Sequence, residues 1–228
     1  MNRDIVITMD MDWVPDRVIE YSLELLASYN IRTTLFMTNY TKVNVSGHEI
    51  GIHPNFTSLK LGKHIKNCLD KFPDAKGIRS HSLFYTERLR PIYAYYGIEY
   101  QSNYMMYRKS GIQPLWISPT TIELPIYWMD NFYMEMEPLV NFSIEGLELD
   151  KEGLKVFCFH PIHIFLNTER LSRYEEAKKC YKSTKDLFEM CNTKNRGIKD
   201  IFLELLNYIK TEHIPGKVLS DIREGFCK

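Results

Sequence analysis

The chain has 228 residues and a formal net charge of zero, with 29 lysines and arginines balancing 29 aspartates and glutamates. This balance argues against a general nucleic-acid binder and against a protein held at a membrane surface by charge. The length suits one domain, residues 1–228, that can bury a sizeable core without disulfides. We expect its motifs at about 4–167 and a helical part at about 168–228.

The five cysteines are odd in number and scattered, and they include no Cys-x-x-Cys pair. This usage indicates free thiols in a reducing cytoplasm. The N-terminus runs straight into a predicted strand without the apolar segment of a signal peptide, and no run of about 18 apolar residues predicts a membrane span. We therefore expect a cytoplasmic protein. The sequence leaves its oligomeric state open.

The first predicted strand ends in two carboxylates. Residues 5–9 form a largely apolar, β-branched run typical of a buried strand, and Asp10 and Asp12 follow it. Successive strand residues point to opposite faces, so these two carboxylates should face the same way. Two close carboxylates need a cation or strong hydrogen bonds to ionise, which favours a metal ligand beside a general base. Alternatively, the pair caps the next helix.

The order of the following elements predicts a parallel α/β sheet. A helix over 15–30 and a strand over 31–38 make a strand–helix–strand opening with a right-handed crossover. Further patterns predict helices at about 60–72, 90–97 and 197–211, an exposed helical stretch at 171–190, and strands at 98–104 and 154–159. The aromatic, proline-rich region 111–137 is expected to form loops and a strand that wall a pocket.

Histidines follow three more of the predicted strands. His53 ends a short strand before Pro54, Arg79 and His81 end a strand at 76–82, and His160 follows strand 154–159. The carboxyl ends of parallel strands lie on one side of a sheet, so these residues should share a rim with the Asp pair. Oxygen and imidazole ligands suit zinc or another divalent first-row metal. A lone histidine is otherwise more often structural.

This ordered set resembles the polysaccharide deacetylases of the NodB homology type, carbohydrate esterase family 4, over about residues 4–167. The matching stretches are Thr8-Met9-Asp10-Met11-Asp12, Gly47-His48-Glu49-Ile50-Gly51 with His53, Arg79-Ser80-His81 and His160-Pro161-Ile162-His163. The last two look most like a branch associated with bacterial surface-polysaccharide gene clusters. The resemblance implies an α/β fold, a distorted (β/α) barrel of about seven parallel strands, here followed by C-terminal helices.

The resemblance also implies roles for individual residues. Asp10 is the general base, Arg79 orients it, and His160 protonates the leaving group. Asp12 and His53 bind the divalent metal, for which we expect Zn²⁺. The candidate substrate-binding residues are Trp13, Trp128, Asp130 and His163, of which Trp128 and Asp130 match the family's fourth motif only weakly.

One position departs from the family pattern. The second motif usually holds two metal-binding histidines four residues apart, and Thr57 stands at the second. Catalytic zinc sites usually have three protein ligands, so a replacement is needed. We predict His81, because it shares a strand face with Arg79, and His163 as second choice. His48, His64 and the Thr57 hydroxyl are less suited.

The implied function is metal-dependent hydrolysis of the N-acyl (acetamido) group of a sugar in bacterial surface polysaccharide biosynthesis. In this chemistry the metal activates water and polarises the amide, and a nearby backbone N–H helps to stabilise the oxyanion. Two alternatives remain: a catalytically inactive, sugar-binding relative, motivated by Thr57, and a metal-dependent hydrolase of another bond. A phosphate site would favour a glycine-rich loop at a helix start, and the sequence has none.

Overall fold

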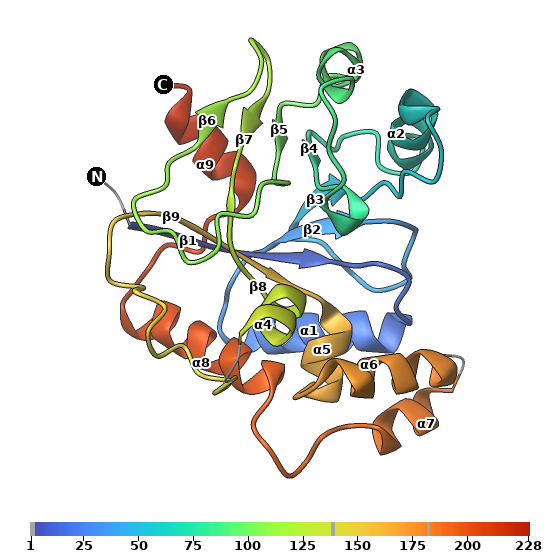
Figure 1. Ribbon diagram of the computed structural model, residues 1–228, viewed down its shortest axis with the longest axis vertical. Helices are drawn as coiled ribbons and strands as arrows, with labels where there is room; N and C mark the ends of the chain where they lie inside the picture. Colours follow the sequence, from blue (N-terminus) through green and yellow to red (C-terminus); the bar gives the residue numbers. More distant parts are fainter. Residues whose placement is uncertain (1–2, 138–139, 182) are drawn as a thin grey trace.

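A nine-stranded sheet forms the centre of the computed structural model, which describes residues 3–137, 140–181 and 183–228 (Figure 1). The strand order is β6-β7-β5-β4-β3-β2-β1-β9-β8, and all neighbours are parallel except β6 and β7. The strands are β1 Arg3–Asp10, β2 Thr34–Met37, β3 Glu49–Ile52, β4 Gly77–Ile78, β5 Tyr100–Gln101, β6 Leu115–Trp116, β7 Ile122–Glu123, β8 Ile126–Met129 and β9 Gly153–Phe159. The sheet curls into a half-barrel, which confirms the predicted fold class.

The strand number differs from the prediction because of region 111–137. We expected one strand there, and the structure has β6, β7 and β8, two of which are only two residues long. So short a strand has no readable alternation of apolar and polar residues. The predicted domain also includes residues 1–2, 138–139 and 182, which lie outside the described residues.

The predicted helices are present, together with four helical elements that the sequence did not indicate. The helical elements are α1 Asp16–Ser28, α2 Leu61–Leu69, η1 His81–Leu83, α3 Leu89–Tyr96, α4 Asp130–Met136, α5 Pro161–Leu166, α6 Leu171–Ala177, η2 Lys178–Cys180, α7 Thr184–Glu189, α8 Ile198–Thr211 and α9 Leu219–Phe226. These four are η1, α4, α5 and α9; α4 lies in region 111–137, where we expected loops and a strand. Among the described residues, no helix is long and apolar enough to cross a membrane.

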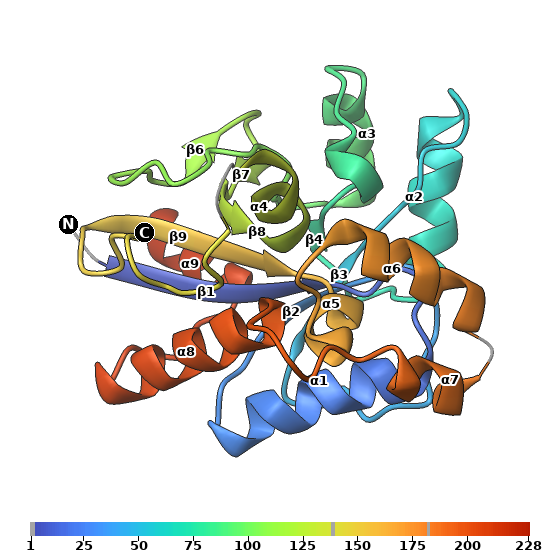
Figure 2. The ribbon, with the colours of Figure 1, turned by 60° about the horizontal axis from the view of Figure 1, so that its bottom comes forward.

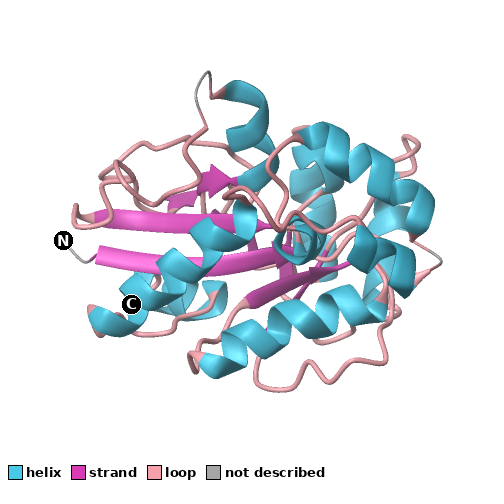
Figure 3. Cartoon of the chain, turned by 90° about the horizontal axis from the view of Figure 1, so that it is seen from below, coloured by secondary structure: helices cyan, strands magenta, loops and turns pink. Residues whose placement is uncertain are grey.

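The long strands β1 and β9 are buried on both faces. Alternate residues Ile5, Ile7 and Met9 pack into a large cluster with α1 and α8, which lie beneath these strands in Figure 2 and in front of them in Figure 3. Val6 points the other way, into an inner cluster that includes residues of α9. This two-sided burial explains why both strands are largely apolar and lack a regular alternation of apolar and polar residues.

The parallel order brings distant strand ends together. β9 pairs with β1 over seven residues, so His160, directly after β9, lies beside Asp10 at the end of β1. β3 and β4 end on the same rim, followed at once by His53 and Arg79. The sheet therefore collects the predicted site residues at its carboxyl edge.

Candidate active site

Asp10 and Arg79 form a buried ion pair at the end of β1. Asp10 Oδ1 accepts a hydrogen bond from Arg79 Nη1 at 2.9 Å, and the Arg79 side chain is fully buried. Burial by itself would raise the pKa of Asp10, but Arg79, His53 and His160 outweigh it and lower that pKa. The Asp10 carboxylate is therefore ionised, with one oxygen held and Oδ2 facing the other site residues.

Arg79 is itself held by uncharged groups. Its Nη1 donates to Thr8 Oγ1 at 2.7 Å, Nε donates to the Ser102 carbonyl oxygen at 2.9 Å, and Nη2 donates to Ser102 Oγ at 2.7 Å. The guanidinium also lies 4.3 Å from the centre of the Phe36 ring. These contacts fix the guanidinium plane and, through it, the orientation of Asp10.

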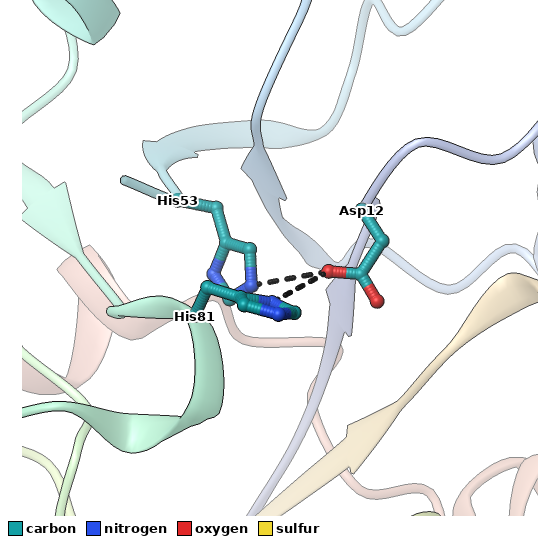
Figure 4. Close-up of side chains that lie close together, drawn as sticks. All are labelled: Asp12, His53 and His81. Atoms are coloured by element: carbon teal, nitrogen blue, oxygen red, sulfur yellow. Dashed lines mark ion pairs between the residues drawn. The ribbon is translucent and has the colours of Figure 1, made fainter. Parts of the chain in front are cut away.

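Asp12 faces His53 and His81 with one oxygen (Figure 4). Asp12 Oδ1 lies 3.3 Å from His53 Nε2 and 3.2 Å from His81 Nδ1. Burial by itself would raise the pKa of Asp12, but the two close imidazoles lower it well below its usual range. Even so, Oδ1 is buried without a well-aligned hydrogen bond, and so is His53 Nδ1. Buried polar atoms in this state are rare in proteins.

This cluster fits a tetrahedral metal ion. Zinc binds carboxylate oxygen and imidazole nitrogen at about 2.0–2.1 Å, which puts neighbouring ligand atoms about 3.3 Å apart. The separations from Asp12 Oδ1 match that spacing, and the three ligand atoms lie within 4.8 Å of one another. Thr57 is exposed and outside the cluster. The residues present therefore suit a divalent cation with His81 in place of the missing family histidine.

Two local details differ from the prediction. β1 ends at Asp10 and β4 ends at Ile78, so strand alternation does not explain why Asp12 and His81 face the site. Asp12 adopts a left-handed φ of 38°, and His81 begins the 3₁₀ turn η1, in which Ser82 and Leu83 have φ values of 56° and 52°. Turns after the strands, and not the strands themselves, aim these two side chains.

His160 is paired with Asp130, which corrects one predicted role. The two Asp130 oxygens accept hydrogen bonds from His160 Nδ1 and from the His160 backbone N–H, both at 2.6 Å. Burial opposes the charged imidazole, but Asp130, helped by Asp12 and Asp10, raises the pKa of His160 to about 10. Asp130, expected to bind substrate, is fully buried and does not line the cavity described below. It orients His160, whose Nε2 lies 4.0 Å from Asp10 Oδ2.

Two other candidate substrate-binding residues are buried. Trp128 is fully buried, with its ring centre 5.1 Å from that of Phe159, and is part of the core under α8. His163 is fully buried as well, and both of its ring nitrogens have protein partners. Strand and helix packing turns these two side chains inward, and neither lines the cavity described below. Trp13 is half exposed, with its ring against the edge of His81 at 5.0 Å.

The site opens into a cavity of about 120 Å³. Its lining combines predicted residues with others that the sequence did not indicate; it comprises Asp10, Asp12, His53, His81, Ser82, Leu83, Met129, Asn131, His160 and Tyr174. Tyr174 comes from the stretch 171–190, which we expected to be simply exposed. No sequence signal indicates that Tyr174 lines the cavity. Asn131 could have been suspected, because it follows the motif residue Asp130 directly. A larger hollow, about 540 Å³ beside α9, is lined by none of the predicted site residues.

Comparison with known proteins agrees with this geometry. A family model described as WbmS-like, polysaccharide deacetylase, matches residues 7–178. The structure resembles that of a candidate polysaccharide deacetylase involved in O-antigen biosynthesis from Bordetella bronchiseptica, with a TM-score of 0.77, 25% identity and 90% of each chain covered. A search of curated proteins found no match.

A more distant likeness shows the fold alone. The structure of 4-alpha-glucanotransferase from Thermococcus litoralis has a TM-score of 0.53 and 14% identity, covering 97% of this chain and 38% of that one. The family model covers most of the chain and includes Asp10, Asp12, His53, Arg79 and His160. The chain therefore belongs to the WbmS-like polysaccharide deacetylase family.

Proposed function

We propose that the protein is a metal-dependent deacetylase that hydrolyses the N-acyl (acetamido) group of a sugar. One observation carries this proposal: two proton-handling pairs, Asp10–Arg79 and His160–Asp130, flank a cluster suited to a cation. A base, an acid and a cation site in one cavity are the parts that amide hydrolysis needs.

Asp12, His53 and His81 would hold the metal, with Zn²⁺ the ion their donor atoms suit best. When bound there, it supplies Lewis-acid polarisation of the amide carbonyl and lowers the pKa of water in the site. Side chains of the protein carry out the proton transfers.

Asp10 and His160 divide the proton transfers. Asp10 Oδ2 takes a proton from water as the water oxygen bonds to the carbonyl carbon; Arg79 keeps the other oxygen occupied. His160 Nε2 gives its proton to the amide nitrogen as the carbon–nitrogen bond breaks, and Asp130 holds the opposite ring nitrogen. The products are a carboxylate and the free amine of the sugar, so water is the only co-reactant.

The size and rim of the cavity support a small acyl group on a sugar. A volume of about 120 Å³ equals roughly four water molecules, and an acetamido group has four non-hydrogen atoms. The sugar ring would then lie at the mouth, where Trp13 offers an exposed aromatic surface. We propose that the substrate is a precursor of a bacterial surface polysaccharide. The five free thiols favour the cytoplasm as the place of reaction.

Acetate release tests the proposal. Zinc-loaded protein is incubated with a panel of N-acetylated sugar nucleotides and short N-acetylated oligosaccharides, and free acetate is measured, with Asp10→Asn as the inactive control. Release by the wild type alone supports deacetylation. Binding of a panel member without release would favour a catalytically inactive sugar-binding protein, and release from non-sugar amides alone would favour a hydrolase of another carbon–nitrogen bond.

His160→Ala separates catalysis from folding. The variant should keep its zinc affinity and release acetate about 10²–10⁴-fold more slowly, because the leaving amine no longer receives a proton. A lower melting temperature with unchanged specific activity would instead mean that His160 only supports the fold.

A further inference from the structure

The second histidine of the His-Pro-x-His sequence has no part in the mechanism above. His163 lies in the first turn of α5, fully buried, with its ring centre 5.7 Å from that of His160. Each histidine contacts one of two consecutive residues at the start of α4: His160 pairs with Asp130, and His163 pairs with Asn131. The two pairs lie beside each other; of the two α4 residues only Asn131 lines the cavity, and of the two histidines only His160 does.

The hydrogen bonds of His163 fix the orientation of the Asn131 amide. His163 Nε2 lies 2.6 Å from Asn131 Oδ1, and His163 Nδ1 lies 3.1 Å from the Thr168 hydroxyl. An imidazole that donates from Nε2 and accepts the Thr168 proton at Nδ1 satisfies both contacts in its neutral form. Burial favours that form, since it lowers the pKa of His163 to about 4. The ring thus holds the Asn131 oxygen away from the cavity.

With Oδ1 occupied, the polar group that Asn131 can offer to a ligand is its Nδ2 amide. Within the described part of the chain, Nδ2 has no hydrogen-bond partner, while the Asn131 backbone N–H is used by Asp130 Oδ1 at 2.7 Å. Asn131 is half buried in the cavity wall with Asp10, Asp12 and His160. Asn131 therefore brings a donor to the cavity whose wall also contains the base and the acid.

We infer that Asn131 Nδ2 donates a hydrogen bond to the acyl oxygen of the substrate and that His163 is the positioning residue that aims it. The inference rests on the proposed function and extends it. When water adds to the carbonyl carbon, the π-electron pair moves to the carbonyl oxygen, and a fixed donor stabilises that charge more than it stabilises the uncharged amide. The His-Pro-x-His spacing then has a physical reason: the first histidine moves a proton, and the second orients a donor.

The acetate ion is a suitable probe, because it carries a charged acyl oxygen and is the expected product. Acetate affinity of zinc-loaded protein is measured by calorimetry for the wild type, Asn131→Ala, Asn131→Asp and the exposed control Asn67→Ala. Loss of a hydrogen bond to a charged group should weaken acetate binding about 10-fold or more in Asn131→Ala. Asn131→Asp keeps the acceptor for His163 but replaces the donor with an oxygen, so it should weaken binding further.

The role of His163 is tested by rescue. His163→Phe keeps the ring volume without Nε2–H and should weaken acetate binding, whereas His163→Gln places an amide donor near the Nε2 position and should restore much of it. The Asn131 side-chain NH₂ signals in ¹⁵N-correlated NMR, assigned by their loss in Asn131→Ala, should shift with acetate in the wild type and not in His163→Phe. Zinc affinity should stay within a few-fold in all these variants.

The outcomes separate this inference from the proposed function. Unchanged acetate affinity in both Asn131 variants, or no acetate binding by the zinc-loaded wild type, overturns the inference even if acetyl sugars are hydrolysed. A wild type that binds acetate through Asn131 but releases none from acetylated sugars sustains the inference as an acyl-binding contact and overturns the proposed function.

Discussion

Asp10 and Asp12 lie two residues apart, and their surroundings differ in kind. Asp10 faces the fully charged Arg79 guanidinium, which is held in turn by Thr8 and Ser102. Asp12 faces two imidazoles, and its Oδ1 is buried without an aligned hydrogen bond. Asp10 Oδ1 is hydrogen-bonded within the chain, whereas Asp12 Oδ1 lacks such a bond and is free to bind the proposed cation. The comparison teaches that two residues of the same type can be suited to different proposed roles, base and metal ligand, by the geometry of their partners.

The largest effect on acetate release should come from removing the negative charge of Asp10 or of Asp12. Asp10→Asn keeps the shape of the side chain, so zinc affinity should stay within a few-fold while acetate release falls about 10²–10⁴-fold. Asp12→Asn should lose zinc and activity together, because a ligand is gone. Zinc content and acetate release are measured on both variants. Loss of zinc in Asp10→Asn with retention in Asp12→Asn would reverse the two roles.

The next largest effect tests how far Arg79 stabilises the buried Asp10 carboxylate. Arg79→Met leaves a buried carboxylate without its cation, and such changes cost about 3–5 kcal/mol in the free energy of unfolding. Urea unfolding measures it. Arg17→Met is the matched control, because Arg17 pairs with Glu20 and Glu24 on an exposed helix face, where the loss should stay below about 1 kcal/mol. Equal losses in the two variants would contradict the comparison.

A second buried carboxylate near Arg79, that of Glu123, should make the stability of the protein depend on pH. Glu123 accepts hydrogen bonds from the backbone N–H groups of Asn103 and Tyr104 and from Gln101 Nε2 at 2.7–3.0 Å. Burial raises the pKa of Glu123 to about 7 against these hydrogen bonds. The folded state therefore binds this proton more tightly than the unfolded state, so the contribution of Glu123 to stability falls as the pH rises from about 4.5 to 7.

Glu123→Gln should remove that dependence. The difference in free energy of unfolding between wild type and variant should change by about 3 kcal/mol between pH 4.5 and pH 7.5, in the direction that favours the variant at high pH. Urea unfolding at both pH values measures it, with the exposed Glu145→Gln as control. A difference that does not change with pH would mean that folding does not raise the pKa of Glu123.

The smallest expected effect concerns His81, the proposed third metal ligand beside Asp12 and His53. His81→Ala should weaken zinc binding by about 100-fold, while His64→Ala and His163→Ala should leave it within a few-fold. Competition with a zinc-binding dye measures the affinities, and melting temperatures check folding. Wild-type affinity in His81→Ala would show that the cation cluster lacks this residue and leave Asp12 with His53 alone.

Local sequence patterns determined the elements and much of the site. The apolar, β-branched run before Asp10 and the largely apolar run before His160 predicted strands, and parallel strands place their ends on one rim whatever their order. Asp10, Arg79 and His160 therefore met as expected, with Asp12 and His53 beside them. The end of a strand depends on residues close together in the sequence, so the local pattern was enough to predict which residues lie there.

Only the tertiary structure decided which neighbours these residues have. Pairing of β8 with β9 sends Trp128 into the core and sets Asp130 behind His160, although 30 residues separate that Asp–His pair. The φ values of 56° and 52° after His81 arise in a turn that strand alternation cannot predict. Tyr174 lines the cavity from α6, a helix whose charged sequence predicted an exposed surface. Such contacts depend on long-range packing and turn geometry, which leave no periodic trace in the sequence.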